Sequence, residues 1–357
     1  MKPKVLLLQG TLSHYRVPIY NLINNEVDLT VAYSKKNECT DGNEFNIIQI
    51  PVSKFGCFYI NKGLLSLCNK YDVVIVMPDL HYLTYIILPF LRRNFKVITW
   101  GIGFRASYKR MYDLSKPKGL YEKVMAAIYR ASDANIFYMK ETFNYWKNEN
   151  LNEEAFFVAH NTVEVKHEYL DTNAKKDSFL FVGTLYREKG ILELLNAYKE
   201  AIQNREEEFP TLNIIGKGDE YNNIKKFIAV NQLEDKIHLL GAIYDEKTLA
   251  SYFSKALLCI SPNQAGLSVL KSFGYGVPYV TKFDAITGGE RLNIIDQENG
   301  FVYSKDYELK DILIKSSTDR DLMEQMSAKT RKYYLENATP QRMASGPIAA
   351  VQYVLKK

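Results

Sequence analysis

Short runs rich in Val, Ile and Leu alternate with amphipathic helical segments along almost the whole chain of 357 residues. Strands that are apolar on both faces and separated by helices form parallel sheets covered by helices on both sides. The pattern begins again after a polar, charged stretch, 164–178, that lacks apolar periodicity. The sequence therefore predicts an α/β fold with two doubly wound parallel-sheet domains.

The domain boundaries follow from that restart. We expect an N-terminal Rossmann-like domain at 1–165, a linker at 166–177 and a second Rossmann-like domain at 178–335, each long enough to bury its own core. The remaining segment, 336–357, contains a predicted helix that could pack back on the N-terminal domain. The predicted strands are Val5–Gln9, Leu29–Tyr33, Val73–Met77, Lys96–Trp100, Ala134–Tyr138, Phe156–Ala159, Phe179–Val182, Leu212–Ile215, Ile237–Leu240, Leu257–Ile260 and Tyr279–Thr281.

Composition argues against a secreted or membrane-spanning protein. The first residues lack the apolar region and cleavage site of a signal peptide. The longest nearly uncharged apolar run, Leu80–Leu91, is interrupted by His81 and Pro89 and is too short to span a bilayer. We expect a cytoplasmic protein with reduced thiols, because the cysteines lack metal-ligand spacing: Cys39, Cys57, Cys68 and Cys259.

Positive charge is concentrated in the segment 51–130, which holds 13 Lys and Arg against 4 Asp and Glu. Such an excess attracts anionic substrates or an anionic membrane surface. The same residues could equally form a solvated surface. Most of the excess comes from Arg92, Arg93, Lys96, Arg105, Lys109, Arg110, Lys116, Lys118 and Lys123.

Glycine-containing turns follow successive strands of the second half. One such turn is weak evidence, because glycine commonly ends a strand or caps a helix. Five turns at the carboxyl ends of one sheet, where ligands of such folds bind, predict an edge lined with backbone amides. The first turn also carries two cations, Arg187 and Lys189, and opens a helix, which suits a phosphate or diphosphate. The turns are Gly183–Gly190, Gly216–Asp219, Gly241–Ala242, Ser261–Ser268 and Thr287–Glu290.

These turns resemble the C-terminal half of family 4 glycosyltransferases. The similarity is in register over about 178–303, through Val182-Gly183, Lys189-Gly190, Gly216-Lys217-Gly218 and Gly276-Val277-Pro278. The N-terminal half resembles the family only in outline. The resemblance implies the GT-B fold, with two Rossmann-like domains facing a cleft. It also implies retaining transfer of a hexose or deoxyhexose from a nucleotide-diphosphate sugar to a glycan or lipid-linked oligosaccharide, in capsule, O-antigen or exopolysaccharide synthesis.

The resemblance assigns roles in the donor site. Lys189 matches the lysine that neutralises the donor diphosphate. Thr184 stands where the family usually has Arg, and Arg187, three residues further on, could supply the guanidinium. Both cations are candidate catalytic residues that stabilise the leaving diphosphate, and no enzymic nucleophile is needed. The remaining donor-binding candidates include Gly183, Gly216, Gly218, Gly266, Leu267 and Ser268.

Two positions depart from the family. Asn263 and Lys271 replace a pair of glutamates, the second of which contacts the nucleotide ribose. Lys271 cannot accept hydrogen bonds from hydroxyl groups, so it could instead reach the phosphates. The requirement for a ribose 2′-hydroxyl would then be relaxed, which adds dTDP-sugars to UDP- and GDP-sugars as candidate donors. Glu290 matches an acidic residue of the family and could compensate, or it could cap a helix.

The first half supplies the acceptor candidates. His14, Tyr15 and Arg16 follow the first strand, in a loop that faces the cleft in GT-B enzymes, and His81 follows a later strand. We expect these side chains to contact the acceptor, although the first three could also contact the donor phosphate and His14 could equally be a surface loop residue. The family often has a histidine where this chain has Gly101-Ile102-Gly103. No metal, cofactor or nucleic-acid partner is expected. The basic and aromatic character of 51–130 suits a lipid-diphosphate acceptor at the cytoplasmic face of the inner membrane, with peripheral attachment.

Three alternatives remain open at the level of sequence. The first is a GT-B protein that binds a nucleotide-sugar without catalysis, which the changes at Asn263 and Lys271 allow. The second is an NAD-dependent oxidoreductase, since Gly101-Ile102-Gly103-Phe104-Arg105-Ala106 has the Gly-x-Gly-x-x-Ala pattern after a strand. The third is a sugar-nucleotide epimerase with the GT-B fold, which the lysine turn disfavours.

Overall fold

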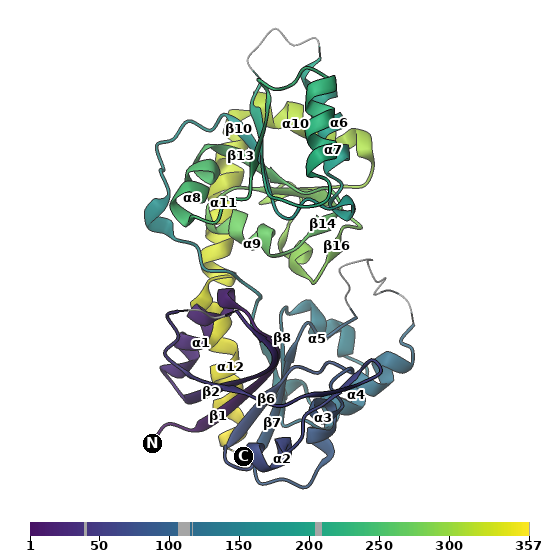
Figure 1. Cartoon of the computed structure of the whole chain (residues 1–357), viewed down its shortest axis with the longest axis vertical. Helices are drawn as coiled ribbons and strands as arrows, with labels where there is room; N and C mark the ends of the chain where they lie inside the picture. The colour runs from purple at the N-terminus through teal and green to yellow at the C-terminus, as the bar shows by residue number, and fades with distance from the viewer. Residues whose placement is uncertain (39–40, 106–114, 116, 204–208, 357) are drawn as a thin grey trace. The chain divides into compact units, whose positions relative to one another are not determined.

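The computed structural model describes residues 1–38, 41–105, 115, 117–203 and 209–356. They form two compact units (Figure 1). The N-terminal unit extends to Val163 and also contains the helix α12 (Pro340–Leu355), whereas the C-terminal unit is Glu164–Thr339.

The N-terminal unit is built on a seven-stranded parallel sheet with the order β3-β2-β1-β6-β7-β8-β9. Every strand predicted in the first half is present. The structure adds β3 and an antiparallel hairpin, β4 (Ser53–Phe55) and β5 (Phe58–Ile60), whose largely exposed residues give no apolar alternation. The sheet strands are β1 (Lys4–Leu12), β2 (Asp28–Asn37), β3 (Asn46–Gln49), β6 (Val73–Val76), β7 (Lys96–Gly101), β8 (Ala134–Phe137) and β9 (Phe156–Val158).

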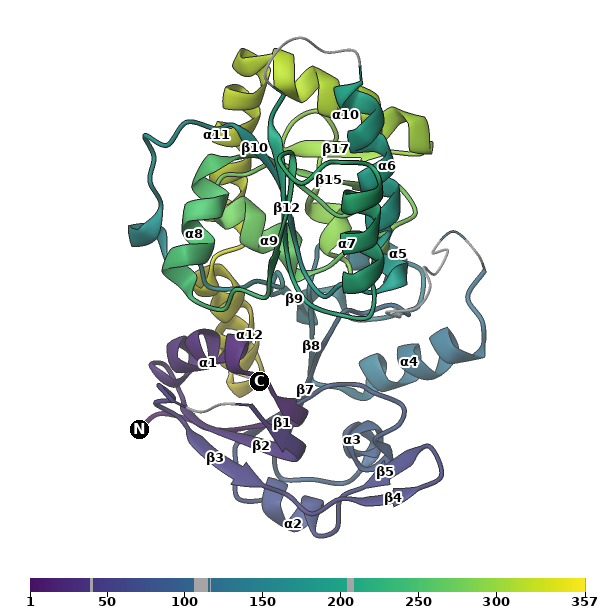
Figure 2. The ribbon, with the colours of Figure 1, turned by 45° about the horizontal axis from the view of Figure 1, so that its top comes forward.

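Helices cover both faces of this sheet. On one face α1 and α12 pack side by side (Figure 2), and α12 contributes Met343, Ala344 and Val351 to the core. Gly346 lets α12 approach β9 closely, because a Cβ there would overlap the carbonyl oxygen of Val158. The opposite face is covered by α2 and α3. The remaining helical bounds are α1 (Val17–Asn24), α2 (Leu64–Cys68), α3 (Leu83–Ile87), α4 (Leu120–Ala131), α5 (Glu141–Trp146), and the 3-10 turns η1 (His14–Arg16), η2 (Leu88–Phe90) and η3 (Glu153–Ala155).

The C-terminal unit contains a six-stranded parallel sheet with the order β12-β11-β10-β13-β15-β17. The predicted strands of the second half are all present, and β17 is an additional edge strand. A short parallel pair, β14 (Gln264–Ala265) and β16 (Ile286–Thr287), joins two loops beyond the sheet. The sheet strands are β10 (Ser178–Val182), β11 (Thr211–Ile215), β12 (Ile237–Gly241), β13 (Ala256–Ile260), β15 (Tyr279–Lys282) and β17 (Gly300–Tyr303).

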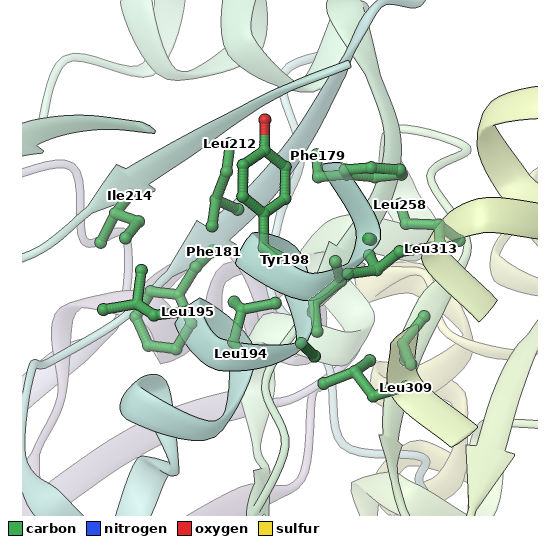
Figure 3. Close-up of a cluster of buried hydrophobic side chains, with 14 of the residues drawn as sticks. Phe179, Phe181, Leu194, Leu195, Tyr198, Leu212, Ile214, Leu258, Leu309 and Leu313 are labelled. Atoms are coloured by element: carbon green, nitrogen blue, oxygen red, sulfur yellow. The ribbon is translucent and has the colours of Figure 1, made fainter. Parts of the chain in front are cut away.

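Side chains of β10 alternate between two cores. Phe179 and Phe181 pack with Tyr198 and with residues of α6 and α10 on one face (Figure 3), whereas Leu180 packs with α8 and α9 on the other. The parallel sheet is therefore covered on both faces, and the predicted α/β fold with two such sheets is confirmed. The helices and turns are α6 (Ile191–Ile202), α7 (Tyr221–Val230), α8 (Glu246–Lys255), α9 (Leu267–Gly274), α10 (Asp306–Thr318), α11 (Arg320–Asn337), η4 (His167–Tyr169), η5 (Arg187–Lys189) and η6 (Glu290–Asn293).

Among the helices of the described ranges, none combines the length and the hydropathy needed to cross a bilayer. The three cysteines that the structure describes, Cys57, Cys68 and Cys259, are free thiols, and Cys39 lies outside the described residues.

Candidate functional site

The strand order of the C-terminal unit identifies a topological switch point between β10 and β13. Chain connections leave the sheet in opposite directions from these two neighbouring strands. In open parallel sheets, ligands bind outside the carboxyl ends of the strands at such a point. The loops concerned are 183–190, after β10, and 261–266, after β13. They carry both candidate catalytic cations and four of the predicted donor-binding residues, Gly183, Thr184, Asn263 and Gly266.

Backbone hydrogen bonds hold the loops of this edge together. The Asn263 N–H donates to the Lys189 carbonyl at 3.3 Å, and the Asn263 carbonyl accepts from Ile286 at 2.9 Å. The Gly183 N–H donates to Ile215, and the Gly216 N–H donates to Gly241 at 2.8 Å. The amides of Gly183 and Gly216 therefore fix the loops to one another. They hold the edge in shape, whereas the sequence suggested that they face a ligand.

Three glycines of this edge are required by close packing. A Cβ at Gly216 would overlap the carbonyl oxygen of Gly183, and a Cβ at Gly218 would overlap that of Leu185. Gly190 has a φ of 71°, in the left-handed region, and a Cβ there would also lie 2.5 Å from Asn263 Nδ2. The glycines thus allow three loops to meet beneath the candidate site.

Lys189 is a buried cation at the switch point. Its side chain lies against Gly183, where an added Cβ would be 3.5 Å from Nζ, and Nζ is 5.7 Å from the centre of the Tyr186 ring. It forms no ion pair with any residue that the structure describes. Burial lowers the pKa of Lys189 from 10.5 to about 8. An ammonium group removed from water without a counter-ion strongly attracts an anionic ligand.

The other cation of the loop is more open. Arg187 and Thr184 are both exposed, and Arg187 has no ion pair or hydrogen bond with the described residues. Its guanidinium is therefore available to a ligand, and its catalytic role stays a prediction.

The N-terminus of α9 also lies at the switch point, directly after the loop that follows β13. Gly266 precedes the helix, and the first N–H groups of any helix, here those of Leu267 and Ser268, lack acceptors within the helix. The hydroxyl of Ser268 is engaged with the Tyr279 hydroxyl at 2.7 Å. The backbone of Ser268, rather than its side chain, is thus the group available to an anion.

Lys271 forms an ion pair with Glu246. Its Nζ lies 2.6 Å from Oε1 of Glu246, and the other carboxylate oxygen of Glu246 accepts a hydrogen bond from the Tyr275 hydroxyl at 3.3 Å. The sequence suggested that Lys271 reaches the phosphates, but the structure directs it to a carboxylate on the neighbouring helix α8.

Glu290 stabilises a turn. Its Oε2 accepts hydrogen bonds from the Gly288 N–H at 3.0 Å and from the Thr287 hydroxyl at 3.3 Å, and the side chain is buried. These bonds go to residues that precede η6, so both roles that the sequence suggested for Glu290, compensation for the lost carboxylate and helix capping, stay predictions. The carboxylate organises the loop after β16.

Sequence reasoning missed three residues of this edge. Tyr186 donates a hydrogen bond from its hydroxyl to Oε1 of Gln264, which ties the loop after β10 to the loop after β13. Glu246 holds Lys271, and Tyr244 exposes its ring beside the end of β12. For Tyr244 and Glu246 the available signal was their place three and five residues after Gly241, at the end of a strand.

The N-terminal unit has its own switch point, between β1 and β6. The loop after β1 carries His14, which is exposed, and Tyr15, which is half-buried. The loop after β6 carries His81, whose Nδ1 lies 2.7 Å from Oδ1 of Asp79. Both sets of acceptor candidates therefore lie where ligands of such sheets bind.

Arg16 lies inside the N-terminal unit. Its guanidinium donates to the Tyr138 hydroxyl at 3.0 Å and lies against the Met343 sulfur at 3.1 Å and over the rings of Tyr15 and Trp100. These contacts with aromatic rings and with α12 hold the end of the loop in place.

The part of the chain that the structure describes contains no group of three or more His, Cys, Asp and Glu side chains placed to hold a metal ion.

Comparisons with known proteins agree with this architecture. Residues 162–333 match the family described as glycosyl transferases group 1. The chain is 28% identical over 236 residues to the poly(glycerol-phosphate) alpha-glucosyltransferase of Bacillus subtilis. The matched region covers 62% of this chain and 34% of that protein. The chain thus spans about a third of the length of the curated relatives that it matches.

Solved structures extend the similarity to the whole chain. A glycosyltransferase from Rickettsia africae superimposes on this chain with a TM-score of 0.73 at 14% identity. The superposition covers 100% of this chain and 99% of the Rickettsia chain. Anabaena HepE in complex with UDP has a TM-score of 0.67 at 12% identity, with 98% and 99% covered. The chain therefore has the GT-B fold, and residues 162–333 within it match the group 1 glycosyl transferases.

Proposed function

We propose that this protein is a retaining glycosyltransferase that moves a hexose or deoxyhexose from a nucleotide-diphosphate sugar to a glycan or lipid-linked oligosaccharide. We place it in the synthesis of capsule, O-antigen or exopolysaccharide. The observation that carries the proposal is Lys189, a buried ammonium without a carboxylate partner among the described residues, at the switch point of the C-terminal sheet. The similarity of residues 162–333 to group 1 glycosyl transferases supports it.

The proposed chemistry needs charge stabilisation more than a nucleophile. When the bond between the anomeric carbon and the diphosphate breaks, negative charge develops on the leaving phosphate oxygen. Lys189, Arg187 and the first-turn amides of α9 would stabilise that charge, in a setting where burial strengthens the interaction. The acceptor hydroxyl attacks from the same face and passes its proton to the departing phosphate oxygen, so the configuration at the anomeric carbon is retained.

The donor candidates are UDP-, GDP- and dTDP-sugars, without a metal ion. Support for a nucleotide donor comes from HepE, a similar fold whose structures were determined with UDP and with UDP-glucose. A screen by native mass spectrometry with these sugars tests the proposal, followed by an assay for released nucleoside diphosphate. Binding with release supports a transferase, because transferases slowly hydrolyse their donor. Binding without release supports the non-catalytic alternative, and absence of binding contradicts both.

Donor binding is expected to weaken as the pH rises through about 8, the pKa of Lys189. Below that pH the ammonium is charged, whereas above it the neutral amine attracts the diphosphate less. Titration calorimetry with UDP from pH 7 to about 8.5 measures the change, because in this range the nucleotide phosphates are already ionised and the uracil ring is still neutral. The Lys189→Met variant is the control and should show a flat profile; a flat profile in the native protein would contradict the assignment.

The oxidoreductase alternative lacks its structural context. The segment from Gly101 to Phe104 follows β7, a late strand, and Gly103 is covered by α5, whose Trp146 donates its indole N–H to the Gly103 carbonyl at 2.6 Å. The next helix that the structure describes begins only at Leu120. A dinucleotide fold needs a helix that opens at the glycines.

We further propose that the protein works in the cytoplasm, attached peripherally to the anionic inner membrane, where a lipid-diphosphate acceptor is found. Large apolar side chains are exposed on adjoining elements of the N-terminal unit: β5 contacts α3, and η2 contacts α4. Phe55 of the hairpin is 77% exposed and Leu120 of α4 is 80% exposed. Exposed cations accompany them at Lys54, Arg92 and Lys123, whereas Arg93 and Lys118 are paired with acids.

Phe55→Ser combined with Leu120→Ser should lower binding to vesicles of phosphatidylglycerol and phosphatidylcholine about tenfold, or about 1.4 kcal/mol. This is a fraction of the roughly 2 kcal/mol that full burial of each side chain would contribute, because residues at the membrane interface are only partly buried. Co-sedimentation at low salt measures the bound fraction. Tyr307→Ser, at a similarly exposed aromatic residue of the C-terminal unit, is the matched control. Equal sedimentation with and without anionic lipid would contradict the membrane proposal.

A further inference from the structure

Glu246 presents a carboxylate that is held in place but still accessible. It is the first residue of α8, five residues beyond Gly241 at the end of β12. Lys271 contacts one carboxylate oxygen and Tyr275 donates to the other. The side chain of Glu246 nevertheless keeps 39% exposure, while that of Lys271 keeps 20%.

The bonding capacity of this carboxylate is not exhausted. Two carboxylate oxygens together offer about four acceptor sites. Lys271 and Tyr275 occupy one site on each oxygen, so the exposed side can still accept hydrogen bonds from hydroxyl groups. A carboxylate at the carboxyl end of a parallel sheet is well suited to a pair of vicinal hydroxyls, such as the 2′- and 3′-hydroxyls of a ribose.

The surroundings of Glu246 fit a nucleoside. Tyr244, two residues earlier, is 76% exposed, and Lys217 Nζ from the loop after β11 lies 5.6 Å from the centre of its ring. An exposed aromatic ring offers a stacking surface to a nucleobase. The exposed ring comes two residues before the carboxylate that begins α8, so one short segment presents both a stacking surface and a hydrogen-bond acceptor.

We propose that Glu246 is the specificity-determining residue that accepts the ribose hydroxyls of the donor, with Lys271 and Tyr275 as its positioning residues. This inference rests on the proposed function, because it assumes a nucleotide donor at this edge of the sheet. The sequence suggested that Lys271 relaxes the requirement for a ribose 2′-hydroxyl, and this inference reverses that prediction. Lys271 replaces the family's carboxylate on α9, but it forms an ion pair with another carboxylate, that of Glu246 on α8. The 2′-hydroxyl is then still recognised, and ribonucleotides are preferred over deoxyribonucleotides.

Titration calorimetry with UDP, GDP and their 2′-deoxy forms tests the proposal on the full chain. The native protein should bind the ribonucleotide about tenfold more tightly, the effect of one hydrogen bond to a charged group. Glu246→Gln should weaken ribonucleotide binding and bring the ratio between the two forms close to one. Glu234→Gln is the matched control, because this exposed glutamate lies near the opposite end of β12. It should leave the ratio unchanged.

A charge exchange separates recognition from folding. In the double variant Glu246→Lys with Lys271→Glu, the ion pair is kept but the carboxylate moves to α9. A preference for the ribose form that survives in this variant supports recognition by the carboxylate of the pair. If the native protein binds both forms equally, or if Glu246→Gln keeps the native ratio, the inference is overturned while the proposed function stands. Failure to bind any of the diphosphates overturns both.

Discussion

Replacing Lys189 with methionine is expected to weaken the binding of UDP by roughly 100-fold, or about 3 kcal/mol, the scale of a charged hydrogen bond in a buried site. Methionine keeps most of the apolar stem and removes only the charge. The loss is large because the ammonium is buried and has no carboxylate partner among the described residues, so its field is directed to the ligand. Titration calorimetry at pH 7 measures the effect.

The same substitution should not destabilise the fold. The pKa of Lys189 is lower in the folded chain than its ordinary value, so the charged group opposes folding at pH 7. The unfolded chain binds more protons between pH 8 and 10.5, and stability contributed by this group therefore rises with pH in that window. We expect an equal or higher melting temperature for Lys189→Met. Lys226→Met, at an exposed lysine of α7, should leave UDP binding unchanged; a threefold loss or less at Lys189 would contradict its role.

Gly216→Ala should lower the melting temperature of the C-terminal unit by roughly 6–12 °C, the equivalent of about 3 kcal/mol for a unit of this size. The added methyl group would overlap the carbonyl oxygen of Gly183, a backbone atom that cannot rotate away. Relief requires the loop after β10 to move, and this loop carries Lys189. Binding of UDP should therefore weaken together with stability, as calorimetry and thermal unfolding would show.

Gly241→Ala is the comparison that isolates the overlap. Gly241 has a φ of 72°, but nothing lies within 4 Å of an added Cβ. Its substitution should cost only the strain of a left-handed conformation, about 1 kcal/mol. Equal melting temperatures for the two variants would show that the Gly183 loop moves freely and that the close approach is not needed.

Much of the architecture could be predicted because local pattern and tertiary structure agree. Each predicted strand is an apolar run, and each lies in a parallel sheet between helices. The strands of the two large sheets that were missed, β3 and β17, are edge strands, where fewer residues need to be apolar. The turn with Lys189 was also predictable, since glycine, cation and helix start lie within eight residues of one another.

Contacts between distant segments could not be predicted in the same way. Lys271 and Glu246 are 25 residues apart, on two helices, and nothing in the sequence around either residue indicates the other. The amides of Gly183 and Gly216 seemed available for a ligand. They donate to neighbouring loops instead, and these hydrogen bonds depend on the order of the strands in the sheet, which the sequence does not reveal. Arg16 was expected to contact the acceptor, but it is buried against Met343, 327 residues away.

The helix α12 has a consequence for the order in which the chain folds during its synthesis. The core of the N-terminal unit includes Met343, Ala344 and Val351, so that core is incomplete until the ribosome has passed residue 354. The C-terminal unit, whose described residues lie between Glu164 and Thr339, is synthesised before α12 and can close first. The N-terminal sheet is therefore synthesised well before the helix that completes its core, and the apolar face that α12 covers stays open to chaperones in the interval.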